Sequence, residues 1–177
     1  MEGLRRILAA VDRAAGWIAL GGGWAAALIM AAIVVHVLTE IVMRSFFGRS
    51  TQVLEEFVGY GLGAMIFLGL GHALREGALV RVDILLGRLG PTPRRGFELF
   101  ACLVTLGVMW FVMRFFLFGV QRHYANETIS MTRAATPLWI PEAVVLLGMA
   151  IFTLQVAVYM LRLLAGGPLL PDSQRTD

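Results

Sequence analysis

Four long apolar runs constrain this chain more than any other feature. They cover residues 17–43, 57–74, 97–120 and 138–161. An α-helix needs about 20 mainly apolar residues to cross the hydrocarbon layer of a bilayer, and each run is long enough to do so. Only 15% of the residues are charged, against about 25% in soluble domains. We therefore predict an all-α integral membrane protein, with one four-helix membrane domain over residues 1–165 and a polar tail over 166–177.

The arginines divide unequally between the two sides of this predicted bundle. Ten fall on the side of the termini and the second connection: Arg5, Arg6, Arg13, Arg75, Arg81, Arg88, Arg94, Arg95, Arg162 and Arg175. Four fall on the other side: Arg44, Arg49, Arg122 and Arg133. Because cytoplasmic loops carry the excess of positive charge, both termini are predicted in the cytoplasm. The first run is longer than the core of a signal peptide, so we expect it to be a retained span.

Two shorter segments have the pattern of amphipathic helices that lie along a membrane surface. Between residues 3 and 15, apolar residues recur at i, i+3 and i+4 while charged residues fall on the opposite side. Residues 80–89 repeat the pattern, and Gly90-Pro91 then ends it. This spacing predicts two interfacial helices beside the four spans.

Charged residues cluster near the predicted outer ends of the first three spans. These are Glu40 and Arg44 in the first, Glu55 and Glu56 at the start of the second, and Arg114 in the third. A charge inside the bilayer is costly unless it is paired or reaches water. The cluster is therefore either a substrate or ion site, or a network of ion pairs that holds the helices together, which is the interpretation that we favour. Arg114 is predicted to lie about 9 Å below the outer end of its span, to face the bundle and to pair with one of the three carboxylates.

The second span is rich in glycine. Gly59 and Gly63 form a GxxxG motif, which allows two helix backbones to approach closely. The motif serves packing within the chain, docking to a second membrane subunit, or both.

Motifs for catalysis, for metal binding and for nucleic-acid binding are absent from the sequence. It has no phosphate-binding glycine loop, no HExxH motif and no basic stripe on a soluble module. Its single cysteine, Cys102, lies in an apolar run. Helix geometry places His36 and His72 about 25 Å apart in depth, too far to ligate one haem iron. We therefore expect neither an enzyme nor a cofactor.

Several short motifs together resemble the small membrane subunit, the DctQ-like family, of tripartite ATP-independent periplasmic (TRAP) transporters. The residues that carry the resemblance are Arg44, Glu55-Glu56, Tyr60, Phe67-Leu68-Gly69, Ala73-Leu74-Arg75, Val80-Arg81-Val82-Asp83 and the entry to the last span, Thr136-Pro137-Leu138-Trp139-Ile140-Pro141-Glu142. In that family an acidic pair opens the second helix, and an Ala-x-Arg and a Val-Asp follow it. The resemblance marks Arg75 and Asp83 as structural or interface candidates.

The resemblance implies a non-catalytic subunit of a sodium-driven secondary transporter for organic acids. Its partners would be the bilayer, a large membrane subunit that moves the substrate by an elevator-type motion, and a periplasmic substrate-binding protein. Two alternatives remain open. One is a haem- or quinone-binding membrane anchor of a respiratory enzyme. The other is a four-helix multidrug exporter, which would need a carboxylate in the middle of its first span, whereas Glu40 lies near the outer end.

Overall fold

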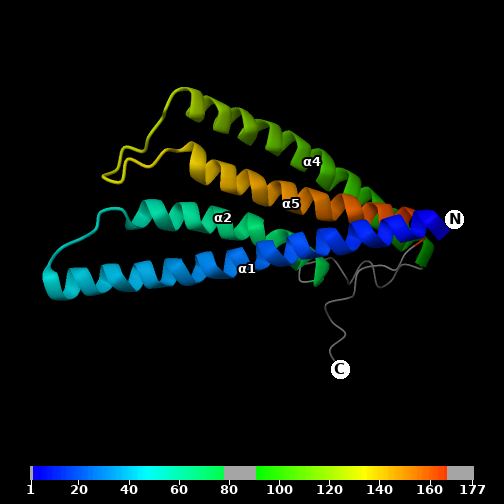
Figure 1. The fold of residues 1–177 in the computed structure, drawn as a ribbon, viewed down its shortest axis with the longest axis horizontal. Helices are drawn as coiled ribbons and strands as arrows, with labels where there is room; N and C mark the ends of the chain where they lie inside the picture. The colour runs from blue at the N-terminus through cyan, green and yellow to red at the C-terminus, as the bar shows by residue number, and fades with distance from the viewer. Residues whose placement is uncertain (1, 78–90, 167–177) are drawn as a thin grey trace.

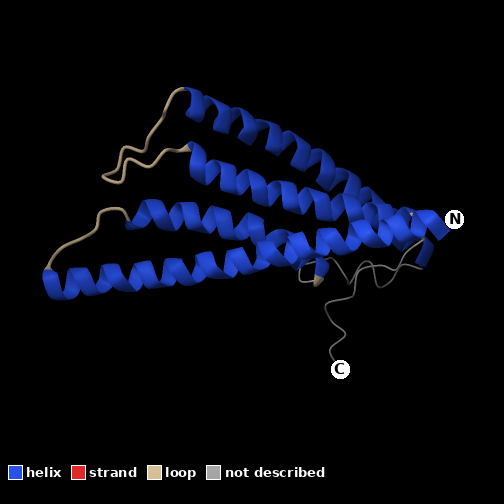
Figure 2. Ribbon diagram, viewed as in Figure 1, coloured by secondary structure: helices blue, strands red, loops and turns tan. Residues whose placement is uncertain are grey.

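A computed structural model of the chain describes residues 2–77 and 91–166. Within these residues the chain forms helices joined by loops, without a named strand (Figure 2). The helices are α1 (Glu2–Phe47), α2 (Leu54–Arg75), α4 (Pro91–Ala125) and α5 (Trp139–Leu164), labelled in Figure 1. All four are long and apolar enough to cross a membrane. The prediction of an all-α protein with four spans is confirmed.

The amphipathic segment at the N-terminus is helical, but it is not the separate interfacial helix that the sequence predicted. α1 runs without a break through 46 residues, from Glu2 to Phe47. The segment lacks proline and continues through Ala14 and Ala15, so no residue interrupts the helical hydrogen bonds before the span begins. The other predicted interfacial helix, residues 80–89, lies outside the described residues, as does Asp83.

α4 also extends well beyond the apolar run that predicted it, from Pro91 to Ala125 rather than over 97–120. Its first turn holds Pro91 and Pro93, which are tolerated there because the N–H groups of a first turn have no partner within the helix. Glycine ends each of the three other helices. Gly48 follows α1 with φ +61°, Gly77 follows α2 with φ +68° and Gly166 follows α5 with φ +79°, a conformation that glycine adopts at little cost.

α5 is the central helix of the bundle. It packs against α2, against α4 and, over a smaller contact, against α1, while α1 packs chiefly on α2. Its buried side chains Phe152, Val156, Tyr159 and Leu163 form a core cluster with Leu74 of α2 and Cys102 of α4. α4 contacts the rest of the bundle mainly through α5, so most of its surface faces outward.

Two glycines allow both neighbours of α2 to approach its backbone at the same level. A Cβ atom on Gly22 of α1 would lie 2.6 Å from the carbonyl oxygen of Leu68, and one on Gly148 of α5 would lie 2.6 Å from the carbonyl carbon of Phe67. The predicted GxxxG motif is not at this contact. Gly63 has only an ordinary contact with Val145, and Gly59 faces open space.

The two ends of the bundle differ in shape and in charge. Figure 1 shows the helices converging at the end where α1 begins and α5 finishes, and spreading at the end with the α1–α2 and α4–α5 loops. We call these the terminal end and the loop end. Helix bounds place Arg75, Arg95 and Arg162 at the terminal end and Arg44 and Arg122 at the loop end. Both ends of the described chain thus lie on one side of the bundle.

Candidate functional site: polar clusters at the two ends of the bundle

At the loop end, Glu40 fixes the α1–α2 loop onto α1. Its side chain is only 2% exposed and accepts hydrogen bonds from four groups. These are Arg44 Nε at 2.7 Å, Ser50 Oγ at 2.5 Å, and the backbone nitrogen and Oγ1 of Thr51 at 3.0 and 2.5 Å. Buried charge is tolerated here because every acceptor position of the carboxylate is used. The expected pairing of Glu40 with Arg44 is present, within a larger set of donors that the sequence did not suggest.

Glu56 holds the α4–α5 loop against α2 in a similar way. It opens α2, accepts a hydrogen bond from the Tyr60 hydroxyl at 3.0 Å, and accepts another from the hydroxyl of Thr132 in the α4–α5 loop. That loop is itself ordered by an isolated antiparallel bridge between Ile129 and Pro137. The neighbouring Glu55 is exposed. The acidic pair therefore divides into one anchored and one exposed carboxylate.

A further contact at the loop end joins α4 to α5. His123 Nδ1 lies 2.9 Å from Glu142 Oε2, in the last turn of α4 and the first turn of α5. The sequence contained both residues, but no local pattern connects positions nineteen residues apart. The loop end thus has three separate carboxylate anchors rather than the single ion-pair network that we predicted.

Arg114 departs most clearly from its prediction. It is exposed on the outward surface of α4, and within the described ranges it has neither an ion pair nor a hydrogen bond. The expectation that Arg114 faces the bundle and pairs with Glu40, Glu55 or Glu56 is wrong. The reason is the packing order, because α5 separates α4 from the helices that carry those carboxylates.

At the terminal end, Asp12 joins three helices. Its carboxylate accepts a hydrogen bond from Arg75 of α2 at 3.2 Å and forms an ion pair with Arg162 of α5. Gln155 of α5, only 2% exposed, completes the cluster. Its side-chain oxygen accepts from Arg75 at 3.2 Å and its amide donates to the carbonyl of Ala15 at 2.6 Å.

Sequence reasoning selected Arg75 from this cluster and missed Asp12, Gln155 and Arg162. Asp12 was assigned to the polar face of a surface helix, which is where an isolated amphipathic pattern would place it. Gln155 was the residue that could have indicated this cluster from the sequence, since an amide inside an apolar span requires a hydrogen-bond partner.

The positions of the histidines argue against haem ligation by His36 and His72. The His72 ring packs against Gly23, where an added Cβ would lie 3.1 Å from it. Gly23 is thirteen residues before His36 on the continuous α1, about 20 Å along the helix. Two axial ligands of one iron cannot be that far apart.

The described fold and its polar groups define a multi-pass helical membrane protein whose buried polar side chains connect its own helices and loops. The family model for tripartite ATP-independent periplasmic transporters, DctQ component, matches residues 33–166, so this chain belongs to the DctQ family. A DctQ component works with a large membrane subunit and a substrate-binding protein in a tripartite transport system. No curated protein and no solved structure matches the chain.

Proposed function

We propose that this chain is the non-catalytic small subunit of a sodium-driven transporter for organic acids in a bacterial inner membrane. In this role it holds the large transport subunit in the bilayer and does not itself carry substrate. Membership of the DctQ family indicates the kind of transport system to which the chain belongs. The subunit's supporting role is our inference from how its polar groups are used.

One observation carries this inference. The buried polar side chains Glu40, Asp12, Gln155 and Glu98 are each bonded to other groups of the same chain, and among the described residues the buried ring nitrogen Nε2 of His36 is left without a hydrogen-bond partner. A substrate site of a secondary transporter instead presents free polar groups and unwound backbone near the middle of the membrane. The four helices here are continuous across their spans, which suits a rigid support better than a moving carrier.

The arrangement of the arginines supports an orientation with both termini in the cytoplasm. The loop end would then face the periplasm, where the substrate-binding protein delivers its cargo. In this orientation Glu40 and Glu56 hold the two periplasmic loops in fixed conformations. We propose no enzymatic step and no cofactor for this chain.

Reconstitution in liposomes tests the proposal. We expect sodium-dependent uptake of an organic acid only when this chain, its large membrane subunit and the binding protein are all present. Collapsing the sodium gradient with an ionophore should stop uptake by the complete system. Uptake by this chain alone, or uptake that is independent of sodium, would contradict the proposal.

A further inference from the structure

The outward surface of α4 combines a cation with a band of aromatic side chains. Arg114 lies among Trp110, Phe111, Phe115 and Phe118, and all five side chains are exposed. Together they line a shallow depression of about 440 Å³. We call these five residues the Arg114 face.

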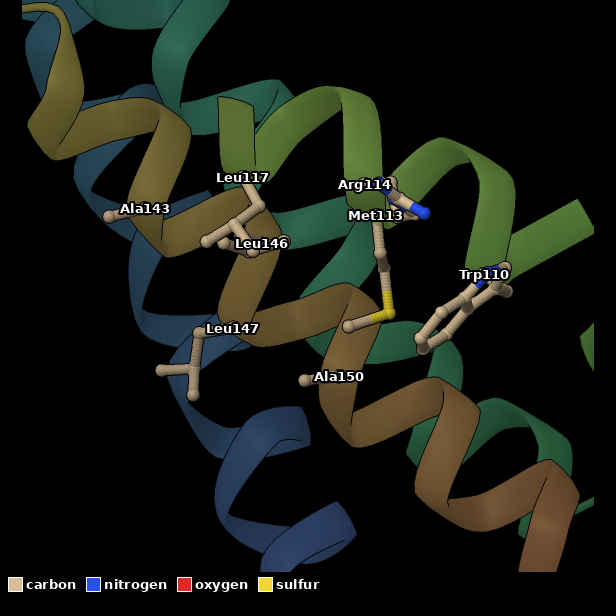
Figure 3. Close-up of a pocket in the computed structure, with 8 residues that line it drawn as sticks. All are labelled: Trp110, Met113, Arg114, Leu117, Ala143, Leu146, Leu147 and Ala150. Carbon is tan, nitrogen blue, oxygen red and sulfur yellow. The ribbon is translucent and has the colours of Figure 1, made fainter. Parts of the chain in front are cut away.

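A second, larger groove begins at the same arginine. It has a volume of about 660 Å³ and runs between α4 and α5, where Leu146, Leu147 and Ala150 form its α5 wall. Figure 3 shows the Arg114 side chain at the border of this groove beside Trp110, directed away from α5. Apart from Arg114, the residues that line both depressions are apolar or aromatic.

The Arg114 face lies deep in the membrane. Arg114 is eleven residues before Ala125, about 16 Å along α4. The edge-to-face pair of Tyr124 and Trp139, with ring centroids 5.5 Å apart, marks the aromatic belt at the loop end. Leu147, which shares the groove with Arg114, is eight residues below Trp139, about 12 Å. The apolar run of α4 ends at Val120, about 9 Å beyond Arg114. Arg114 therefore lies about 9–16 Å below the loop-end boundary of a hydrocarbon layer that is about 30 Å thick, and its side chain approaches water only by extending along α4.

A charged side chain at this depth requires an acceptor, and the described part of this chain does not provide one. Three carboxylates of the loop end are bound elsewhere: Glu40 to its loop, Glu56 to Thr132 and Glu142 to His123. The exposed carboxylates Glu55 and Glu127 lie on α2, which α5 separates from α4, and in the α4–α5 loop, thirteen residues beyond Arg114. The described residues thus leave Arg114 without an acceptor.

We propose that the Arg114 face docks against a transmembrane helix of the large membrane subunit, and that an acidic side chain of that helix pairs with Arg114 inside the membrane. This inference rests on the proposed function, which supplies the partner. Arginine and tryptophan are the residues most often found at the energetic centre of protein interfaces. The surrounding aromatic rings would exclude lipid and strengthen the ion pair.

Two other occupants fit less well. The phosphate of a lipid headgroup lies at the membrane surface, beyond Val120 and so more than about 9 Å above Arg114. A second copy of this chain, related by a two-fold axis across α4, would bring one Arg114 against the other at the same depth. A transmembrane helix of a protein partner provides a carboxylate at the depth of Arg114 itself.

The experiment uses the complete transporter, purified from membranes by a tag on the large subunit. We compare Arg114→Gln and Arg114→Lys with the matched control Arg122→Gln, an exposed arginine in the last turn of the same helix. Arg114→Gln should lower the amount of small subunit recovered by about three- to twentyfold, the range measured for polar contacts between membrane helices. Arg114→Lys, which keeps the charge, should recover part of the loss, and Arg122→Gln should behave as wild type.

Photo-cross-linking identifies the occupant directly. A benzophenone side chain at Phe111 or Phe118 should form an adduct with the large subunit. The same probe at Leu28 or Val35, which are exposed on α1, should give much less of this product. Thermal unfolding of the isolated subunit should be unchanged by Arg114→Gln, because the residue has no partner within the described chain.

The outcomes separate this inference from the proposed function. If the wild-type chain does not co-purify with the large subunit, the proposed function itself fails. If the wild type co-purifies and the Arg114→Gln and Arg122→Gln variants do so equally well, the docking assignment is overturned while the function stands. Adducts of Phe111 and Phe118 with lipid, or with a second copy of this chain, would overturn it in the same way.

Discussion

The carboxylate of Asp12 lies 3.2 Å from the guanidinium of Arg75, although the two residues are 63 positions apart. Arg75 also donates to the backbone carbonyl of Asp12 at 3.3 Å. Gly16 makes room for this contact, since a Cβ atom there would lie 3.0 Å from Arg75 Nη2. The pair joins the beginning of α1 to the end of α2, and Arg162 of α5 shares the same carboxylate. Asp12 therefore joins α1, α2 and α5 at the terminal end, while Glu98 of α4 pairs separately with Arg94.

Replacing Asp12 should destabilise the subunit more than replacing its partner Arg75. Asp12→Ala leaves Arg75 and Arg162 without their carboxylate, and we expect it to lower the free energy of unfolding by about 3 kcal/mol. Arg75→Met leaves Asp12 paired with Arg162, so its cost should be about 1 kcal/mol. Thermal unfolding in detergent measures both changes. Arg13→Ala, at the exposed neighbouring residue, is the control, and equal losses for Asp12→Ala and Arg13→Ala would contradict the prediction.

The Glu40 anchor predicts a local effect on the α1–α2 loop. Glu40→Ala removes the acceptor of the Thr51 amide and of the Ser50 and Thr51 hydroxyls. The Thr51 amide should then exchange with deuterium about tenfold faster, the equivalent of one hydrogen bond of about 1.4 kcal/mol. Hydrogen exchange followed by mass spectrometry of this loop measures the change. Glu55→Ala, at an exposed carboxylate, should leave the exchange rate unaltered, and similar rates in both variants would exclude the anchor.

The glycines of α2 and its neighbours differ in what an added methyl group would meet. Gly148→Ala places a Cβ 2.6 Å from the backbone of Phe67, so α5 must move away from α2 at a cost of about 1–3 kcal/mol. Gly59→Ala meets nothing within 4 Å and should be neutral or stabilising by up to about 1 kcal/mol. The free energy of unfolding of the isolated subunit, measured for each variant, compares the two substitutions. A larger loss for Gly59→Ala would mean that the GxxxG motif, and not the Gly148 contact, sets the packing of α2.

The predicted orientation is tested with reporters at the two ends of the bundle. A reporter active only in the periplasm should give no signal when fused after Asp177. The same reporter inserted at Glu127, an exposed residue of the α4–α5 loop, should be active. A reporter active only in the cytoplasm should give the opposite pair of results. Activity of the periplasmic reporter at Asp177 would reverse the orientation.

Much of the architecture could be predicted from the sequence because it depends on local properties. Apolar runs longer than a bilayer is thick determine the number of spans, and the predicted run over 138–161 agrees closely with α5 at Trp139–Leu164. The predictions for α1 and α4 were too short. Counting apolar residues locates the part of a helix that lies in lipid, whereas a helix ends only where its backbone hydrogen bonds end.

The pairing of the candidate site residues could not be predicted in the same way. Glu40 and Arg44 are one helical turn apart, so their contact follows from the sequence alone. Asp12, Gln155 and Arg114 needed the tertiary structure. Helical periodicity places a side chain on one face of its own helix, but the packing order decides which helix, if any, covers that face. Packing α5 between α4 and the other helices gave Asp12 two arginine partners at the terminal end and left Arg114 facing outward.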